Sequence, residues 1–234
     1  MNRVFAAGAF IAVFGIFYPE LTAWCGEPSS AKEALQALND YIGGWKGNGF
    51  SEKNKSEIWK ESANWGWRFK GKDAWLTVDL ENGKHFKKGE VRYLLDKGVY
   101  QLTLTDSAGK PLVFEGGVKN RRLTLVREDK EKQETQQLQM YLAGGGVRFI
   151  YEYAIKPANR TLFTKDFQVA MTREGETFGT SAKKPECVVT GGLGTMAVTH
   201  SGVTYYVCCS GCRDAFNENP EKILKEYRAR KKGK

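Results

Sequence analysis

Apolar and polar residues alternate with a period of two through most of the middle of the chain. Residues 100–105, 147–156 and 167–171 each place apolar side chains at every second position, with mainly polar side chains between them. Such alternation gives a strand one buried and one hydrated face, which is typical of an antiparallel meander. The pattern predicts about eight to ten strands between residues 44 and 173. We expect them to close into a barrel, because closure removes exposed strand edges.

A short helix is predicted before the first strand, over residues 30–42. Ser30 and Glu33 have the spacing of a capping box, and Leu35 and Leu38 fall on one helix face. The helical pattern ends at a glycine-rich segment, after which the period of two begins. The fold class expected for this part is therefore mainly β with one N-terminal helix.

The segment 43–49, Gly-Gly-Trp-Lys-Gly-Asn-Gly, leads into the first strand. Its Gly-x-Trp-like pattern resembles the lipocalin and fatty-acid-binding superfamily, especially its small bacterial and nitrobindin-like barrels. The resemblance implies a calycin-like antiparallel β-barrel over residues 30–173, with Trp45 closing one end. Trp65 and Trp67 would share one face of a strand. They either line a ligand cavity or pack the core, and a barrel of this size favours core packing.

The first residues have the pattern of an export signal. Arg3 precedes an uncharged stretch over residues 4–18, and Leu-Thr-Ala at 21–23 resembles a signal-peptidase site. As a helix this stretch would extend only about 22 Å, against roughly 30 Å for the hydrocarbon core of a bilayer, so residues 1–23 are predicted to be a signal peptide. Cys25 leaves a lipid-modified N-terminus open, although the bulky Trp24 argues against it. The expected destination is the periplasm or cell envelope, an oxidising compartment.

Residues 174–186 interrupt the strand pattern with several turn formers and few apolar side chains, which predicts a linker. It would separate the barrel from a C-terminal module over residues 187–230. The formal net charge of +9 raises the question of nucleic-acid binding. Much of that charge lies in residues 228–234, where basic side chains suit the C-terminal end of a helix. No nucleic-acid partner is therefore expected.

Four of the five cysteines lie between residues 187 and 212. Three of them have the spacing Cys187-x20-Cys208-x3-Cys212, and Cys209 directly follows the second. Asn-Pro at 219–220 predicts the start of a helix shortly afterwards. Thiolates near a helix N-terminus are stabilised by the helix dipole, which lowers their pKa and favours metal ligation. The cysteine spacing therefore predicts a metal site.

This pattern resembles the TRASH and YHS families of metal-binding modules. The resemblance implies a small α+β treble-clef module that handles copper or a heavy metal, with Cys187, Cys208 and Cys212 as its ligands. The residues that carry it are Cys187, the segment Tyr-Tyr-Val-Cys-Cys-Ser-Gly-Cys at 205–212, Phe216, and Asn-Pro-Glu-Lys at 219–222.

The number of available ligands bears on the choice of metal. Thr190 stands where a second cysteine of a Cys-x-x-Cys pair would complete a four-cysteine site. Three thiolates suit Cu(I), whereas structural Zn usually has four ligands, so the expected ion is Cu(I) or Zn. If residues 201–202 form a two-residue turn, His200 lies roughly 16 Å from Cys208, too far to share an ion. Cys209 would point away from Cys208, as successive strand residues do, and at most adjoin the site.

Two other interpretations of the cysteines remain open. Exported proteins oxidise their thiols, so a Cys187–Cys208 or Cys187–Cys212 disulfide competes with metal binding. A module that keeps its fold without an ion is the other. The odd number of cysteines disfavours a design based on disulfides alone, because one thiol is left over.

No enzymatic activity is predicted. The chain has two histidines, neither in a recognisable catalytic setting, and it lacks a nucleophile motif such as Gly-x-Ser-x-Gly. The leading hypothesis is an exported protein that binds or delivers a soft metal ion, with an unknown protein partner. The alternative is that the barrel carries a small apolar ligand and the cysteine module serves as a structural or interaction domain. An enzyme that uses the metal at an open coordination position ranks third.

Overall fold

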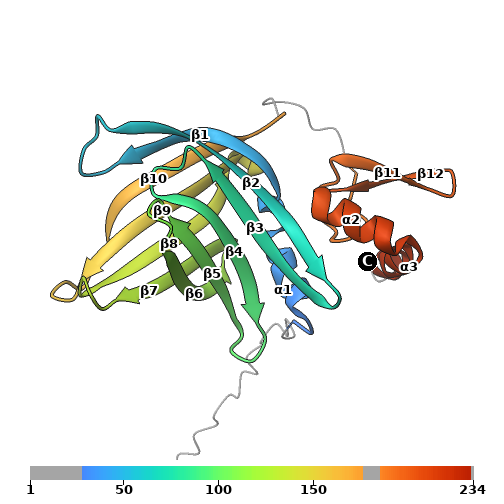
Figure 1. Cartoon of the computed structure of the whole chain (residues 1–234), viewed down its shortest axis with the longest axis horizontal. Coiled ribbons are helices and arrows are strands. Elements are labelled where there is room, and N and C mark those ends of the chain that lie inside the picture. The colour runs from blue at the N-terminus through green and yellow to red at the C-terminus, as the bar shows by residue number, and fades with distance from the viewer. Residues whose placement is uncertain (1–27, 176–184, 233–234) are drawn as a thin grey trace, which may run out of the picture.

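The computed structural model describes residues 28–175 and 185–232. The predicted signal peptide, Cys25 and most of the predicted linker lie outside the described residues. Ten antiparallel strands form a closed barrel, in which neighbours in sequence pair and β1 also pairs with β10 (Figure 1). The elements, after the short helices α1 (Ala31–Leu35) and η1 (Gln36–Tyr41), are β1 (Gly43–Ser51), β2 (Ile58–Lys70), β3 (Asp73–Glu81), β4 (Phe86–Leu94), β5 (Val99–Asp106), β6 (Pro111–Lys119), β7 (Arg122–Asp129), β8 (Glu134–Ala143), β9 (Arg148–Pro157) and β10 (Thr164–Arg173).

Alternate side chains of the strands fill the interior of the barrel. Leu102 of β5, Val169 of β10 and Trp67 of β2 are all fully buried, as the period of two predicts. The mainly β class and the closed antiparallel barrel are therefore confirmed. The interior leaves a cavity of about 20 Å³ beside Trp65 and Phe149, which is room for roughly one water molecule. Trp65 and Trp67 pack the core rather than line a ligand chamber.

The N-terminal helical segment closes one end of the barrel. Ser30 is its N-cap, and the Ser30 hydroxyl accepts a hydrogen bond from the Glu33 backbone N–H at 3.2 Å, as the capping-box spacing predicts. The Glu33 carboxylate accepts from Ser29 instead of returning to the Ser30 backbone. At the far end of the segment, the Tyr41 hydroxyl donates to the Met140 carbonyl of β8 at 2.8 Å. The helix is thereby fixed to the barrel wall.

Trp45 packs beneath this segment at the start of β1. Its indole N–H donates to the Tyr41 carbonyl at 2.7 Å, and its side chain is fully buried. The ring lies 5.5 Å from the Phe149 ring, and the Arg173 guanidinium lies 4.2 Å from its centroid. Trp45 therefore has the end-closing position that the sequence pattern led us to expect.

Aromatic side chains also close the opposite end of the barrel. The His85 ring stacks on Phe167 at 3.9 Å between centroids, and Trp59 meets His85 edge-on at 5.2 Å. Burial lowers the pKa of His85, which favours the neutral imidazole in this stack. His85 directly precedes β4, at the end of the segment Asn-Gly-Lys-His that connects it to β3.

A buried carboxyl group lies just inside this end. Glu61 is 2 % exposed, and it accepts hydrogen bonds from the Tyr151 hydroxyl at 2.6 Å and from the Trp59 indole N–H at 2.9 Å. Burial raises the pKa of Glu61 above its usual 4.5, and the two hydrogen bonds offset only part of that shift. The folded barrel therefore favours the protonated form of Glu61.

The pKa shift predicts how barrel stability depends on pH. Because the folded-state pKa of Glu61 is raised, its stabilising contribution is complete below the unfolded pKa and is lost as pH rises through the folded pKa. We expect Glu61→Gln to raise the melting temperature at pH 8 by a few degrees, since each kcal/mol moves it by about 2–4 °C at this size. The gain should vanish at pH 4, measured by thermal denaturation, and the exposed Glu128→Gln is the control. A lower melting temperature at both pH values would show that the ionised carboxylate stabilises the barrel.

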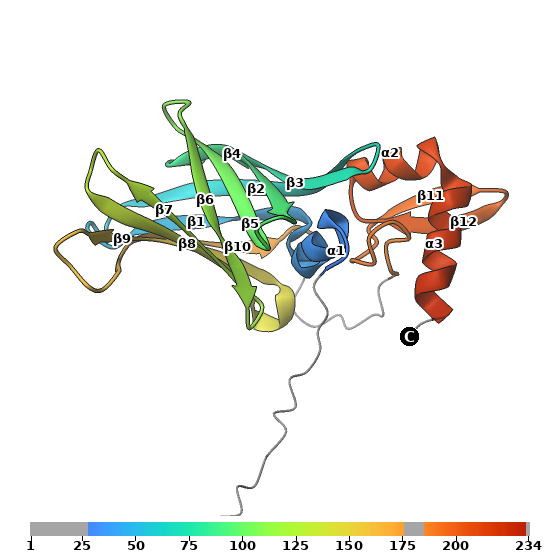
Figure 2. The same ribbon diagram turned by 90° about the horizontal axis from the view of Figure 1, so that it is seen from below.

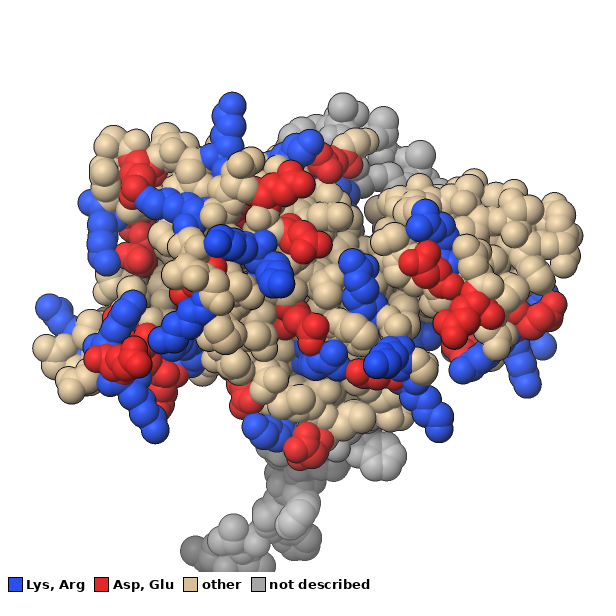
Figure 3. All heavy atoms as spheres, viewed as in Figure 1, with Lys and Arg blue, Asp and Glu red and all other residues tan. Residues whose placement is uncertain are grey.

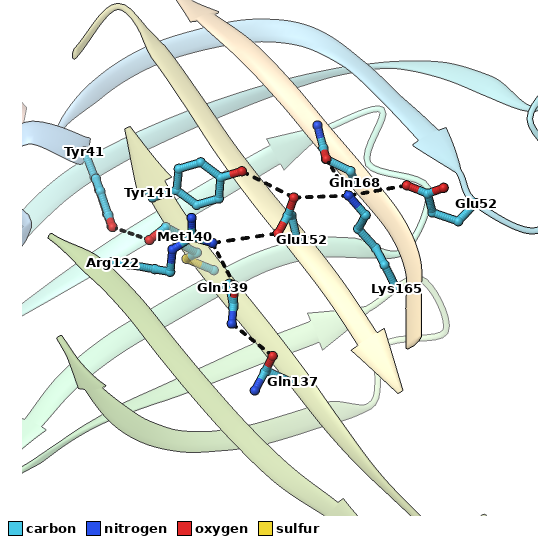
Figure 4. A network of polar contacts seen from close by, with 10 residues as sticks. All are labelled: Tyr41, Glu52, Arg122, Gln137, Gln139, Met140, Tyr141, Glu152, Lys165 and Gln168. Carbon is cyan, nitrogen blue, oxygen red and sulfur yellow. Dashed lines mark hydrogen bonds and ion pairs between the residues drawn. The ribbon is translucent and has the colours of Figure 1, made fainter. Parts of the chain in front are cut away.

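The outer face of strands β7 to β10 carries a network of polar side chains (Figure 4). Glu152 accepts hydrogen bonds from the Tyr141 hydroxyl at 3.3 Å and from the Lys165 ammonium at 3.2 Å. Arg122 donates to Gln139 at 2.7 Å on the neighbouring strands. On the face shown in Figure 3, basic and acidic side chains are interspersed rather than gathered in one patch. Exposed pairs of this kind contribute about 0–1 kcal/mol each, so they hydrate the barrel more than they stabilise it.

The elements that follow β10 form a module beside the barrel. It contains a hairpin of β11 (Met196–His200) and β12 (Val203–Val207), followed by α2 (Ser210–Glu218) and α3 (Pro220–Lys232). Asn219 caps α3, because its side-chain oxygen accepts from the Lys222 N–H at 3.1 Å, and the predicted helix start is confirmed. Helix α1 lies between the barrel and the module (Figure 2). Within residues 28–175 and 185–232, no helix is both long and apolar enough for a membrane span.

Candidate metal centre

The hairpin β11–β12 and the start of α2 position three of the cysteines. Ser201 and Gly202 form the turn with positive φ angles of 49° and 75°, which suits a two-residue hairpin. Strand β12 ends at Val207 and brings Cys208 to the base of the hairpin. Cys209 is the N-cap of α2, and Cys212 lies in the first turn of that helix. The two cysteines of the Cys-x3-Cys pair therefore flank the N-terminus of α2, whereas the sequence marked a helix start only at 219–220.

A tight loop before the hairpin supplies Cys187. The Cys187 N–H donates to the Gly192 carbonyl at 2.7 Å, and the Gly191 N–H donates back to the Cys187 carbonyl at 2.9 Å. Gly191 has a φ of +79°, which other residues adopt only with strain. The Val188 N–H donates to the Tyr206 carbonyl of β12 at 2.9 Å. This bond attaches the loop to the hairpin and sets Cys187 opposite Cys208.

The three predicted ligands come together. The sulfur atoms of Cys187, Cys208 and Cys212 all lie within 4.8 Å of one another, and those of Cys208 and Cys212 are 3.4 Å apart. Three sulfurs bound to one ion at ~2.3 Å would lie roughly 4 Å apart. The three residues are 0 %, 5 % and 0 % exposed, respectively. The donor set and its spacing therefore fit a soft metal ion held away from water.

Thr190 occupies the position beside the cluster where a fourth ligand would stand. Its side chain is 1 % exposed, and its hydroxyl oxygen lies 3.6 Å from the Cys208 sulfur. A hydroxyl at this distance can donate to a thiolate, which stabilises the charge without bonding to the ion. The sulfur count at the buried site remains three.

The protonation of the thiols reflects their crowding. Hydrogen bonds from the Cys208 and Cys212 thiols lower the pKa of Cys187, whereas burial raises the pKa of Cys212. Without an ion, three buried sulfurs this close cannot all be ionised, because their negative charges would repel in a medium of low dielectric constant. Binding a cation would therefore release protons, and affinity should fall towards acidic pH.

Contacts from other elements hold the ligand loop. The Arg230 guanidinium of α3 donates to the Val188 carbonyl at 3.0 Å and to the Cys187 carbonyl at 3.4 Å. The Asn39 side-chain amide of η1 donates to the Thr190 carbonyl at 2.9 Å. Contacts of this kind hold metal-bonding residues in the orientation that an ion requires. One of them comes from the barrel side of the molecule.

The structure corrects the expected position of Cys209. We expected its side chain to point away from Cys208, but the two sulfurs are 3.9 Å apart. The expectation was wrong because β12 has already ended at Val207, so strand alternation no longer applies. Cys209 is only partly buried, and its sulfur accepts from the Trp67 backbone N–H of β2 at 3.3 Å. It adjoins the site at the interface with the barrel.

His200 lies where the predicted hairpin register places it. It pairs with Val203 at the turn, and its ring faces Phe216 at 6.3 Å between centroids. Its imidazole nitrogen Nε2 lies 3.2 Å from the Glu221 carboxylate. His200 is not a member of the metal-ligand group that the structure assembles among the described residues.

The module packs directly against one edge of the barrel. Strand β1 begins at Gly43, opposite Trp65. Among the residues that the structure describes, positions 66–70 of β2 therefore pair only with β3. The Trp67 backbone on this edge meets the module: its N–H donates to Cys209, and its carbonyl oxygen lies against Gly211. A Cβ atom on Gly211 would come within 1.8 Å of that oxygen. No pattern in the sequence predicts this contact.

All four described cysteines are free thiols in the structure. The sulfur atoms of Cys208 and Cys212 lie 3.4 Å apart, a pair that the disulfides expected from the sequence did not include, since both involved Cys187. The fifth cysteine, Cys25, lies outside the described residues.

Comparison with known proteins gives no functional assignment. No family model matches the chain, and no curated protein matches it. Among solved structures, that of Rv2717c from M. tuberculosis aligns with 60 % of this chain and 97 % of its own, at 16 % sequence identity and a TM-score of 0.40.

Proposed function

We propose that this protein binds a thiophilic metal ion through Cys187, Cys208 and Cys212. The observation that carries the proposal is the buried group of three sulfur atoms within 4.8 Å of one another. Elements far apart in sequence, namely the loop at 187–192 and the start of α2, converge to form it. Contacts from Arg230 and Asn39 fix the loop in place. A cluster of buried thiols with this support is typical of a metal site.

Cu(I) is the ion that the donor set favours over Zn. Three soft sulfur ligands suit Cu(I) in a trigonal arrangement, whereas structural Zn is almost always bound by four ligands. The fourth position is taken by the Thr190 hydroxyl, which is a poor ligand for either ion. The resemblance of the cysteine segment to TRASH and YHS modules, and to their treble-clef fold, supports the same choice.

The proposed setting is the cell envelope. The charge pattern of residues 1–23 supports export, and a site that binds a soft ion there would serve binding or delivery rather than catalysis. The barrel interior offers little support for the alternative role as a carrier of an apolar molecule. Its cavity of about 20 Å³ would have to enlarge greatly before a small organic ligand could fit.

The proposal is tested by adding Cu(I) to the reduced protein without oxygen. We expect about one equivalent to bind and to produce a sulfur-to-metal charge-transfer band in the ultraviolet. The variant Cys208→Ser/Cys212→Ser should lose the band, because only one of the three sulfurs remains.

Cys25→Ser is the matched control, since it removes the fifth thiol and leaves the cluster intact. Binding by the double variant that equals binding by the native protein would refute the site. Parallel titrations with Zn²⁺ in competition show which ion the site prefers.

A further inference from the structure

The three sulfurs of the proposed site have little access to solvent. Cys187 and Cys212 are fully buried and Cys208 is 5 % exposed. A metal ion does not diffuse through a protein as a bare ion; it passes between ligands. An incoming complex therefore needs a sulfur that it can reach before the buried ones.

Cys209 is the most exposed of the four described cysteines. It is the one cysteine among the described residues that is partly exposed rather than buried. Its sulfur lies 3.9 Å from that of Cys208, a separation that one ion bonded to both would span. Cys187 completes a tight group with Cys208 and Cys212 that does not include Cys209. Cys209 thus adjoins the cluster without belonging to it, and it is less buried than the three proposed ligands.

The barrel holds Cys209 in this position. The Trp67 N–H on the free edge of β2 donates to the Cys209 sulfur at 3.3 Å. Gly211 seats the start of α2 against the carbonyl of the same residue, Trp67. The barrel therefore helps to orient this thiol, together with its neighbour Cys208 at 3.9 Å.

We propose that Cys209 is the exchange thiol of the site, through which the ion passes to and from the buried cysteines. The proposal rests on the metal-binding function proposed above. The donor is a thiolate complex of Cu(I). The Cys209 sulfur bonds to the ion as one bond to the donor thiolate breaks, and the Cys209 proton passes to the released thiolate. Cys208 then bonds to the ion from 3.9 Å away, and Cys187 and Cys212 displace the second donor thiolate and Cys209. The three ligand thiols give up their protons as they bind, one to Cys209, one to the second donor thiolate and one to solvent. Copper stays Cu(I) throughout.

Exchange kinetics test the proposal on the full chain. Native protein and Cys209→Ser are loaded from Cu(I)–glutathione and stripped with a bathocuproine chelator in a stopped-flow spectrometer. We expect loading and stripping rates both to fall by roughly tenfold or more in Cys209→Ser, because a prepositioned thiol is lost. The equilibrium affinity should change by less than ~10-fold, the lower limit for residues that only support ligands. Ser210→Ala, one residue further on, is the control and should exchange like the native protein.

Each other outcome overturns a distinct claim. Unchanged rates in Cys209→Ser would refute the exchange role while leaving metal binding intact. A loss of affinity beyond ~100-fold would make Cys209 a permanent ligand and would also refute the role. A native protein that binds no Cu(I) would overturn the proposed function and the inference together.

Thiol alkylation gives a second readout that does not depend on rates of metal transfer. Iodoacetamide is added to the metal-loaded protein, and modified cysteines are located by peptide mass spectrometry. We expect Cys209 to react while Cys187, Cys208 and Cys212 are protected. Protection of Cys209 equal to that of the other three would contradict its proposed position outside the coordination shell.

Discussion

Replacing Cys187 by serine is expected to abolish tight metal binding. Cys187 is the one proposed ligand supplied by the loop at 187–192, so its loss leaves two sulfurs: Cys208, just after β12, and Cys212, in the first turn of α2. Losing a residue that merely supports a ligand costs about 10–100-fold in affinity, and losing a bonded thiolate should cost more than that. Competition titrations with a Cu(I) chelator measure the difference directly.

His200→Ala is the matched comparison for Cys187→Ser. Its ring contacts Phe216 and Glu221, and it is not among the grouped ligand atoms, so we expect affinity to stay within a few-fold of the native value. Equal damage by the two substitutions would mean that the site is Cys3His and that the hairpin register is wrong. Four ligands of that kind would move the preferred ion from Cu(I) towards Zn.

Gly211→Ala is expected to weaken the attachment of the module to the barrel. The new Cβ would lie 1.8 Å from the Trp67 carbonyl oxygen, and the backbone of a strand that is paired with β3 along its other edge cannot move aside easily. Without this contact, alanine in the first turn of α2 would stabilise the helix by about 1 kcal/mol. Whether the melting temperature falls or rises therefore shows whether the module is docked on the barrel. We expect it to fall, together with faster amide hydrogen exchange at Trp67.

Gly117→Ala in β6 provides the control for this substitution. In the described part of the chain, no heavy atom beyond Gly117 and its two neighbours lies within 4 Å of a Cβ placed there, so alanine should be neutral or slightly stabilising. A Gly211→Ala protein that is more stable than the native one would show that the module does not dock as described.

Much of the barrel was predictable because its determinants are local. Period-two alternation marks strands whatever their partners, and the segment 106–109, rich in turn formers, is closed by the Gly109 N–H, which donates to the Asp106 carbonyl at 3.0 Å. The capping position of Ser30 and the helix start at Asn219 also follow from neighbouring residues. What could not be predicted is how nearly the aromatic side chains fill the interior, since that depends on volumes contributed by all ten strands.

The candidate site was predictable in part for the same reason. Cysteine spacing indicated Cys187, Cys208 and Cys212, and the hairpin register that separates His200 from them followed from the turn at 201–202. The position of Cys209 was not predictable, because it depends on β12 ending one residue before Cys208. Strand ends are set by tertiary contacts, and a shift of one residue reverses the direction of a side chain.

The contact between module and barrel was outside the reach of sequence patterns. Composition at 174–186 predicts a linker, and a linker suggests two units without a preferred arrangement. The asparagine that links them, Asn39, donates to the Thr190 carbonyl and accepts from the Trp67 indole N–H at 3.1 Å. A single polar residue in a helix gives no indication of partners so distant in the chain.

The free edge of β2 has a consequence for the colloidal behaviour of the protein. A short strand edge with open N–H and carbonyl groups is a template on which another chain can add a strand. Here the start of α2 covers that edge through Cys209 and Gly211, and the fold of that segment includes a proposed metal ligand, Cys212. An ion that holds the segment together would thereby keep the edge shielded. Loss of the ion at high protein concentration would then favour self-association through β2. The proposed metal site would in this way also keep the protein soluble.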